Sequence, residues 1–280
     1  MTPIEGWALR TRVAGVEEVW VVRGYRHPEG YLVATPYMRG SRRLKPYDLS
    51  LAPPWTMRWV DCIGRTVPLL DRREAEALDP ERALKLRRKD LPGEVLELLE
   101  LLSPEWTGLA GSWALFSEKR GSDVDLLLYG DFRNVLLELR EEGLIAPCRE
   151  EERYEKVKDA LSPDDYAELS RHRLLDSCYK GKPYTIRALR TLEPEPCSGR
   201  VEYLGSYEGE IEIVDNADSF LLPARYLVRL GVQEAILESW HSRYAELPLG
   251  KYEASLRLSV EGGQVKASPD IYGYLRPLRT

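Results

Sequence analysis

The stretch Leu109-Ala110-Gly111-Ser112, followed after ten residues by Asp123-Val124-Asp125 and the apolar run Leu126-Leu127-Leu128-Tyr129, decides how this sequence is interpreted. A Gly-Ser turn that opens a short helix presents backbone N–H groups and a hydroxyl to an anion. Because side chains alternate along a strand, Asp123 and Asp125 are expected on one face. The pattern therefore predicts a strand with two carboxylates at its mouth, beside the start of a short helix.

Two carboxylates placed in this way can share a divalent cation with the phosphates of a nucleotide. We assign Asp123 and Asp125 as catalytic residues and as ligands of Mg²⁺ or Mn²⁺. Gly111 lets the backbone approach the phosphates closely, and Ser112 donates a hydrogen bond to a terminal phosphate. Ser122 holds the loop before Asp123 by a side-chain-to-backbone hydrogen bond. The alternative interpretation is a surface turn that happens to carry two acids.

The apolar lead-in, Gly-Ser, the ten-residue spacer and Ser-Asp-Val-Asp before an apolar strand resemble the signature of the DNA polymerase β-like nucleotidyltransferase superfamily. In outline the chain also resembles an archaeal family of predicted nucleotidyltransferases, over Gly24–Pro28, Thr107–Gly130, Lys182–Leu189 and Ile213–Tyr226. The resemblance implies an α+β fold. A central polymerase β-like nucleotidyltransferase core, a mixed sheet with helices, would be flanked by N-terminal and C-terminal β-rich domains.

The resemblance also implies a metal-dependent nucleotidyltransferase, which moves a nucleoside monophosphate from an NTP to an acceptor hydroxyl on RNA, on a protein or on a small molecule. Members of the superfamily usually bring a third carboxylate from a later strand. The strand expected here, Tyr184–Leu189, carries Thr185 and Arg187 instead. Substitute acids are Asp176 or a C-terminal group, Glu210, Glu212, Asp215 and Asp218.

Three functions follow from this pattern. The first is the nucleotidyltransferase, and the second is a catalytically inactive nucleotide- or nucleic-acid-binding protein, which the missing acid favours. The third is an interaction protein with the central unit as a scaffold. Arg187 is a phosphate clamp, an ion-pair partner of Asp125, or part of a structural salt bridge. Trp240–Tyr244 is either a stacking site for bases or ordinary packing.

Composition divides the chain into four regions. Short runs of strand formers, at residues 19–22 and 31–35, make residues 1–75 a β-rich domain. Residues 76–103 are a helical connector, with a cap at Asp79 and a second helix that begins near Leu91–Gly93. Residues 104–192 form the nucleotidyltransferase-like αβ domain, in which we expect Asp131 to cap a helix through Leu144 and Ser162 to begin another. After a stiff linker at residues 193–196, residues 198–280 form a second β-rich domain, in which we expect Phe220 as a core anchor and a hairpin turn at Glu261–Gln264.

Bulk properties restrict the class of protein. The 280 residues are 43% hydrophobic and 31% charged, with a net charge of −6, which excludes a generally basic nucleic-acid-binding surface. Two local basic groups, Arg39–Lys45 and Arg82–Lys89, are nucleic-acid contacts or solvated faces with their own ion pairs. With no apolar run long enough for a membrane span and no secretory signal, we expect a cytoplasmic protein without membrane partners.

Side chains sensitive to heat are rare. Asparagine and glutamine occur only at Asn134, Asn216, Gln233 and Gln264, which favours a thermophilic source. The four cysteines, Cys62, Cys148, Cys178 and Cys197, are expected as small buried residues. In a hyperthermophile, a Cys148–Cys178 or a Cys178–Cys197 bridge is the alternative.

Overall fold

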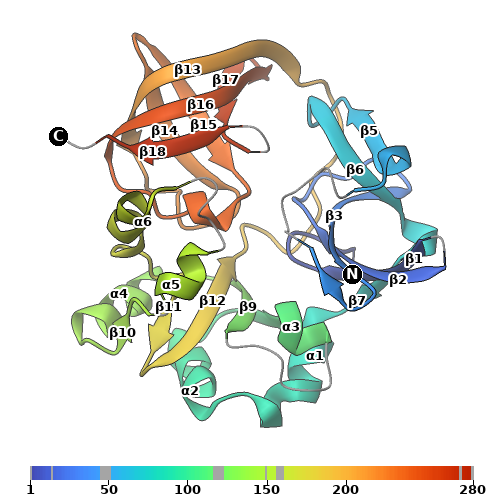
Figure 1. The fold of residues 1–280 in the computed structure, drawn as a ribbon, viewed down its shortest axis with the longest axis vertical. Coiled ribbons are helices and arrows are strands. Elements are labelled where there is room, and N and C mark those ends of the chain that lie inside the picture. The colour runs from blue at the N-terminus through green and yellow to red at the C-terminus, as the bar shows by residue number, and fades with distance from the viewer. Residues whose placement is uncertain are drawn as a thin grey trace.

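The computed structural model describes residues 2–13, 15–44, 52–115, 123–148, 150–155, 161–270 and 273–278. Three sheets are arranged around the molecule (Figure 1), one N-terminal, one central and one C-terminal. Their strand orders are β5-β6-β3-β2-β1-β7 with β4 beside β3, then β10-β11-β12-β9-β8, then β13-β14-β15-β17-β16-β18.

The N-terminal sheet is entirely antiparallel. Its core side consists of large apolar residues that meet the central sheet, among them Trp20 and Leu9, both fully buried. The expected strands at residues 19–22 and 31–35 lie in β2 and β3. The strands are β1 (Ala8–Val13), β2 (Val16–Val22), β3 (Tyr31–Arg39), β4 (Arg42–Arg43), β5 (Met57–Val60), β6 (Arg65–Asp71) and β7 (Glu76–Leu78).

Two helices, α1 (Pro80–Arg87) and α2 (Gly93–Leu102), follow as expected. Asp79 caps α1, because its carboxylate accepts the N–H groups of Glu81 and Arg82 and proline occupies the first helical position. Helix α2 buries an apolar stripe against the central sheet, formed by Val95, Leu98, Leu99 and Leu102.

The central sheet is mixed. Its two middle strands, β9 and β12, run parallel, while the other pairs are antiparallel. Its elements are β8 (Trp106–Leu109), α3 (Gly111–Leu115), β9 (Val124–Tyr129), α4 (Arg133–Glu141), β10 (Ile145–Ala146), α5 (Glu150–Tyr154), α6 (Pro163–Ser170), β11 (Asp176–Tyr179) and β12 (Lys182–Ala188). Ser162 caps α6 as expected, because its Oγ accepts from Asp165 N. The expected cap of α4 was wrong: Phe132, not Asp131, is its N-cap, and the helix ends at Glu141.

The C-terminal sheet is dominated by a long antiparallel pair, β13 with β16, whose partners run from Glu202↔Val260 to Ile213↔Gly250. The expected hairpin at Glu261–Gln264 joins β16 to β17, and both of its glycines have positive φ. The strands are β13 (Glu202–Asp215), β14 (Ala224–Leu230), β15 (Gln233–Ser239), β16 (Gly250–Glu261), β17 (Gln264–Ser268) and β18 (Tyr274–Pro277). Three-residue 3-10 helices lie at Pro54–Thr56, Arg72–Glu74, Arg88–Asp90 and Ser242–Tyr244.

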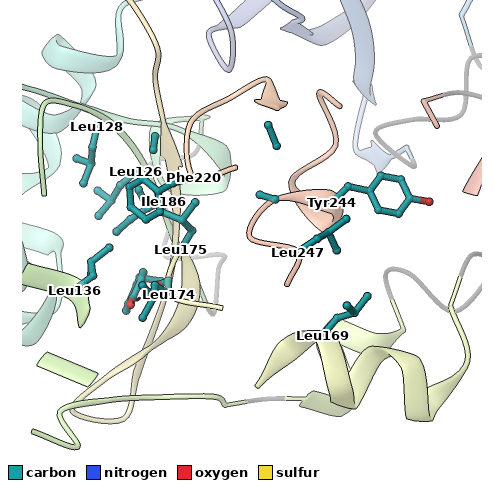
Figure 2. Packing of buried hydrophobic residues seen from close by; sticks show 14 of the residues in the cluster. Leu126, Leu128, Leu136, Leu169, Leu174, Leu175, Ile186, Phe220, Tyr244 and Leu247 are labelled. Carbon is teal, nitrogen blue, oxygen red and sulfur yellow. Dashed lines mark hydrogen bonds between the residues drawn. The ribbon is translucent and has the colours of Figure 1, made fainter. Parts of the chain in front are cut away.

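One apolar core joins the central sheet to the C-terminal unit. Phe220, from the loop before β14, lies among Leu126, Leu128 and Ile186 of the central sheet (Figure 2), and it is 5% exposed. Phe220 therefore anchors the core, as expected. Tyr244 and Leu247 continue the same cluster towards α6.

The expected α+β fold class, organised by a polymerase β-like core, was wrong. Strands hold 45% of the described residues and helices 22%, so this part of the protein is predominantly β. The physical reason is the length of the two outer sheets. The 14-residue β13 and the 12-residue β16 are each longer than any helix among the described residues. The N-terminal sheet adds seven strands.

Both cysteine pairs are disulfides. Cys148–Cys178 is one of the two alternatives considered, whereas Cys62–Cys197 was not expected. The second bridge ties the loop after β5 to the segment before β13. That segment, expected as a stiff linker, is held further because Glu195 N donates to Tyr25 O and Val201 N donates to Asp61 O. In the part of the chain that the structure describes, no helix has the length and apolarity to cross a membrane.

Glu246 joins the C-terminal unit to the central sheet and makes stability depend on pH. Its carboxylate accepts from Leu174 N and Leu175 N at 2.9 and 3.0 Å, with the charged groups Arg173 and Asp176 nearby. Burial raises the pKa of Glu246 from 4.5 to about 7. An acid with a raised folded pKa stabilises the fold fully below its unfolded pKa, and this contribution is lost as the pH rises through about 7.

We therefore expect the free energy of unfolding to fall by about 3 kcal/mol between pH 4.5 and pH 7.5 through this group. Urea denaturation of the wild type and of Glu246→Gln across this range measures it, since the variant cannot ionise and should show a flatter pH dependence. Glu234→Gln, on the exposed part of β15, is the control and should retain the wild-type slope. Parallel curves for the wild type and Glu246→Gln would contradict the assignment.

Candidate functional site

The Gly-Ser turn and the acidic strand are in contact. Ala110 N donates to Asp125 O at 2.9 Å, and Gly111 has φ +59. A Cβ at residue 111 would lie 1.8 Å from Asp125 Oδ2, so the carboxylate lies directly against the glycine. The structure thus brings Gly111 and Asp125 together. Only glycine fits here, because both the backbone conformation and the space exclude a side chain.

The remaining predicted site residues are placed as follows. Asp123 directly precedes β9, and the alternation of the strand puts it on the face of Asp125 and Leu127. Ser112 lies in the first turn of α3 and is half-buried. Ser122, to which we assigned the loop-holding bond, lies outside the described residues.

The N-terminal sheet packs against the acid-bearing face of the central sheet. Leu127, on that face, is fully buried in a cluster with Ile4, Trp7 and Leu9, and a Cβ at Gly6 would lie 2.7 Å from Leu127 Cδ2. The two carboxylates therefore lie near the junction of two sheets.

Tyr37 of β3 lies near this junction. No role for it was predicted from the sequence. It is 8% exposed, and burial raises the pKa of its phenol. The charges of Asp125 and Asp123 raise this pKa further, while Arg43 and Arg187 oppose them. The Arg43 guanidinium lies 5.1 Å from the centre of the Tyr37 ring. One phenol thus lies within electrostatic reach of both acids and of two arginines, which no local sequence pattern indicates.

Arg187 forms a buried ion pair with Glu5, the structural alternative considered for it. Its Nη1 lies 2.9 Å from Glu5 Oε1. Glu5 is completely buried and also accepts from Gly24 N at 2.8 Å and from Arg23 Nη1 at 3.5 Å. The arginine on the strand next to Asp125 is therefore positioned by a carboxylate from the N-terminal segment.

A third acid, Asp176, lies on the same face of the central sheet. Thr185 is the register partner of Asp125 across β12 and β9, and Asp176 is the partner of Thr185 across β11. Thr185 Oγ1 donates to Asp176 Oδ1 at 3.0 Å. Asp176 is neutralised by Arg153, whose Nη1 lies 2.8 Å away and whose side chain is 6% exposed. The substitute acid considered from the sequence is thus two strands from Asp125 and is tied to an arginine.

The C-terminal acids contribute to the C-terminal sheet and its loops. Glu210 pairs with Lys251 at 2.6 Å, and Glu212 with Arg229 at 2.7 Å. Asp215 accepts from Ala217 N, and Asp218 pairs with Arg190 at 2.9 Å. Within the described ranges, no group of three or more histidine, cysteine, aspartate or glutamate side chains is arranged to hold a metal ion.

Two other candidate surfaces have structural explanations. Trp240 packs on Gly24 and Tyr25, while His241 and Tyr244 are buried, so these residues form ordinary packing. The basic stretch at residues 82–89 forms its own ion pairs, Lys85–Glu81, Arg87–Asp90 and Arg88–Glu100. In the other basic group, Arg39 pairs with Glu18, and Lys45 lies outside the described residues.

No protein-family model, curated protein or solved structure matches this chain.

Replacing Gly111 with Ala is expected to displace the Asp125 carboxylate, because the added Cβ occupies its position. The left-handed backbone adds a cost of about 1–2 kcal/mol. Urea denaturation measures this loss. Gly40→Ala is the matched control, since its φ is +54 and nothing lies within 4 Å of its Cβ. Equal effects of the two substitutions would show that the contact with Asp125 is unimportant.

Proposed function

We propose that the chain is a nucleotidyltransferase that binds an NTP with Mg²⁺ or Mn²⁺ at Gly111, Ser112, Asp123 and Asp125. The observation that supports this is the contact of the Asp125 carboxylate with Gly111. Gly111 and Asp125 are 14 positions apart, and they bring a helix start and a carboxylate together in the buried junction between two sheets.

The donor set suits such a metal ion. Mg²⁺ is commonly held by one or two carboxylates together with substrate phosphates, and Asp123 and Asp125 supply that number. When bound, the ion would neutralise charge on the phosphates and on the leaving pyrophosphate. Asp123 and Asp125 would hold it, Gly111 would let the backbone approach the triphosphate, and Ser112 would donate a hydrogen bond.

In the proposed reaction, the acceptor hydroxyl oxygen forms a bond to the α-phosphorus as the bond from that phosphorus to the pyrophosphate oxygen breaks. The hydroxyl proton passes to solvent. Arg187, held by Glu5, provides fixed positive charge on the strand next to Asp125. The acceptor is RNA, a protein or a small molecule.

A second candidate is a nucleotide-binding protein without turnover. The observation that favours it is the ion pair between Asp176 and Arg153, which neutralises the third acid on this face of the sheet. Binding needs only the two strand acids and the turn, whereas nucleotidyl transfer commonly employs two metal ions held by shared carboxylates.

Thermal melts with each NTP, with and without Mg²⁺, test for binding. A ligand at 100 times its Kd adds about 2.7 kcal/mol of apparent stability, and we expect such a metal-dependent gain with at least one NTP. Asp123→Asn combined with Asp125→Asn should abolish the gain. The control, Glu208→Gln with Glu234→Gln, removes two exposed carboxylates from the C-terminal sheet and should retain it. An equal gain in both double variants would overturn the proposed site.

Turnover is tested by pyrophosphate release from α-labelled NTP with RNA, protein and small-molecule acceptors. Release that the two asparagine substitutions abolish supports the transferase. Metal-dependent binding without release for any acceptor supports the second candidate.

We further propose a cytoplasmic setting in a thermophile, for which two disulfides have precedent. Trapping of free thiols in freshly lysed cells tests it, since all four cysteines should resist labelling.

A further inference from the structure

A cavity lined by both apolar and charged residues separates the N-terminal sheet from the C-terminal sheet, away from Asp123 and Asp125. Its volume is about 150 Å³, several times the ~10–15 Å³ that one water requires. The two sheets meet beside it, because Arg257 of β16 donates to Gly64 O and a Cβ at Gly64 would lie 2.6 Å from Val201. In Figure 1 this is where β6 approaches the C-terminal sheet. Its wall carries six cationic side chains, Arg23, Arg26, Arg65, Arg225, Arg257 and Lys266.

Four of these cations are paired with carboxylates. Arg26 contacts Glu195 at 2.9 Å and also Glu261, while Lys266 contacts Glu261. Arg225 contacts Glu238 at 2.9 Å. Arg23 is shared with the buried Glu5 at 3.5 Å. These pairs use the acids of the wall, apart from Asp270.

Arg65 and Arg257 carry the positive charge of the wall that these ion pairs do not neutralise. Among the described residues, neither forms an ion pair within 4.0 Å, and the buried Nε of Arg65 has no hydrogen-bond partner. The Arg257 guanidinium lies 4.0 Å from the centre of the Tyr203 ring. Burial lowers the pKa of Arg257, and the nearby charge of Arg65 lowers it further. Two guanidinium groups therefore repel one another at the edge of the cavity.

Two further titratable groups of the wall are Asp270, whose charge offsets part of that of Arg65, and His241. Asp270 is buried, and its two carboxylate oxygens accept from Ser239 Oγ at 2.6 Å and from Trp240 N at 2.8 Å. The charge of Arg65 opposes the rise that burial causes in the pKa of Asp270, and it adds to the lowering of the pKa of His241. Burial lowers the pKa of His241 well below its usual value, so the imidazole is neutral at pH 7.

We propose that this cavity binds a compact phosphate-class anion between the guanidinium groups of Arg65 and Arg257. Arginine presents planar pairs of N–H donors that match phosphate oxygens, and the hydrogen bonds between such charged groups are strong. An anion with two or more charges would relieve the repulsion between the two arginines. Orthophosphate, pyrophosphate and phosphate monoesters share this chemistry. The site is separate from the proposed nucleotidyl-transfer site.

Calorimetric titration with orthophosphate, pyrophosphate and a sugar phosphate, in EDTA and at ionic strength matched with NaCl, tests the proposal and separates these sources. We expect saturable binding of at least one of them, and a rise in Tm that NaCl does not reproduce. Arg65→Met with Arg257→Met should weaken that binding at least 10-fold. Arg12→Met with Arg58→Met, two exposed arginines outside the cavity, should bind like the wild type.

The same titration in Asp123→Asn with Asp125→Asn should be unchanged, which separates this site from the proposed nucleotide site. Should the arginine double variant fail to fold, modification of the wild type with phenylglyoxal replaces it. Pyrophosphate should then protect Arg65 and Arg257, but not Arg58, from labelling detected by mass spectrometry. No binding beyond the NaCl control, unchanged affinity in Arg65→Met with Arg257→Met, or equal labelling with and without the anion would overturn the proposal.

Discussion

Replacement of Glu5 by Ala is expected to lower the free energy of unfolding by about 3–5 kcal/mol, because it removes a buried carboxylate from an ion pair. Glu5 is completely buried and is shared by Arg187, Arg23 and Gly24 N. Without its carboxylate, the Arg187 guanidinium, 18% exposed, loses a partner at 2.9 Å in the junction between the N-terminal and central sheets. Urea denaturation, monitored by tryptophan fluorescence, measures the loss.

The matched control is Glu17→Ala on β2. Glu17 contacts Arg10 at 3.6 Å, but its side chain is 58% exposed, and such surface pairs contribute about 0–1 kcal/mol. Glu5→Gln keeps a hydrogen-bond acceptor for Gly24 N and lacks the charge, so its loss should lie between the two. If Glu5→Ala costs no more than Glu17→Ala, the ion pair of Glu5 does not stabilise the junction of the two sheets.

The second large effect concerns Cys62–Cys197. This disulfide joins residues 135 positions apart, and the chain-entropy relation assigns such a loop about 5 kcal/mol. Cys148–Cys178 joins residues 30 positions apart, for which the same relation gives about 3.6 kcal/mol. Cys62→Ala with Cys197→Ala should therefore destabilise the protein more than Cys148→Ala with Cys178→Ala.

Urea denaturation of both double variants under oxidising conditions provides the comparison. Each variant serves as the control for the other, because each removes one bridge and leaves the second intact. Adding a reductant to Cys62→Ala with Cys197→Ala should cause a further loss near that of the shorter bridge alone. The reverse order of stability would show that interactions in the folded state outweigh loop closure.

Local signals in the sequence were sufficient to predict several individual elements of the fold. Asp79 and Ser162 cap helices as expected, since a cap depends on residues two or three positions away. The hairpin turn at Glu261–Gln264 likewise depends only on neighbouring residues. The fold class was wrong because strand content depends on how far β13 and β16 pair, which short windows of sequence do not reveal.

In the candidate site, too, the sequence predicts the local features and not those that depend on distant parts of the chain. Gly111 and Asp125 were expected near one another, and the structure places the carboxylate against the glycine. The row Asp176–Thr185–Asp125 follows from strand register, and a shift of one residue would turn these side chains to the other face. Glu5 carries no sequence signal at all, because its role arises only when the N-terminal segment meets Arg187.

The path of the chain between residues 189 and 201 limits how this architecture can be divided. Before entering the C-terminal sheet, the backbone returns to the N-terminal one and bonds to Tyr25 and Asp61, with Cys197 bridged to Cys62. The segment that the sequence predicts as a linker is therefore bonded to the N-terminal sheet. Exchange of the last 80 residues between homologues would have to carry the matching surface of the first 70, so the two outer sheets are constrained to evolve as one unit.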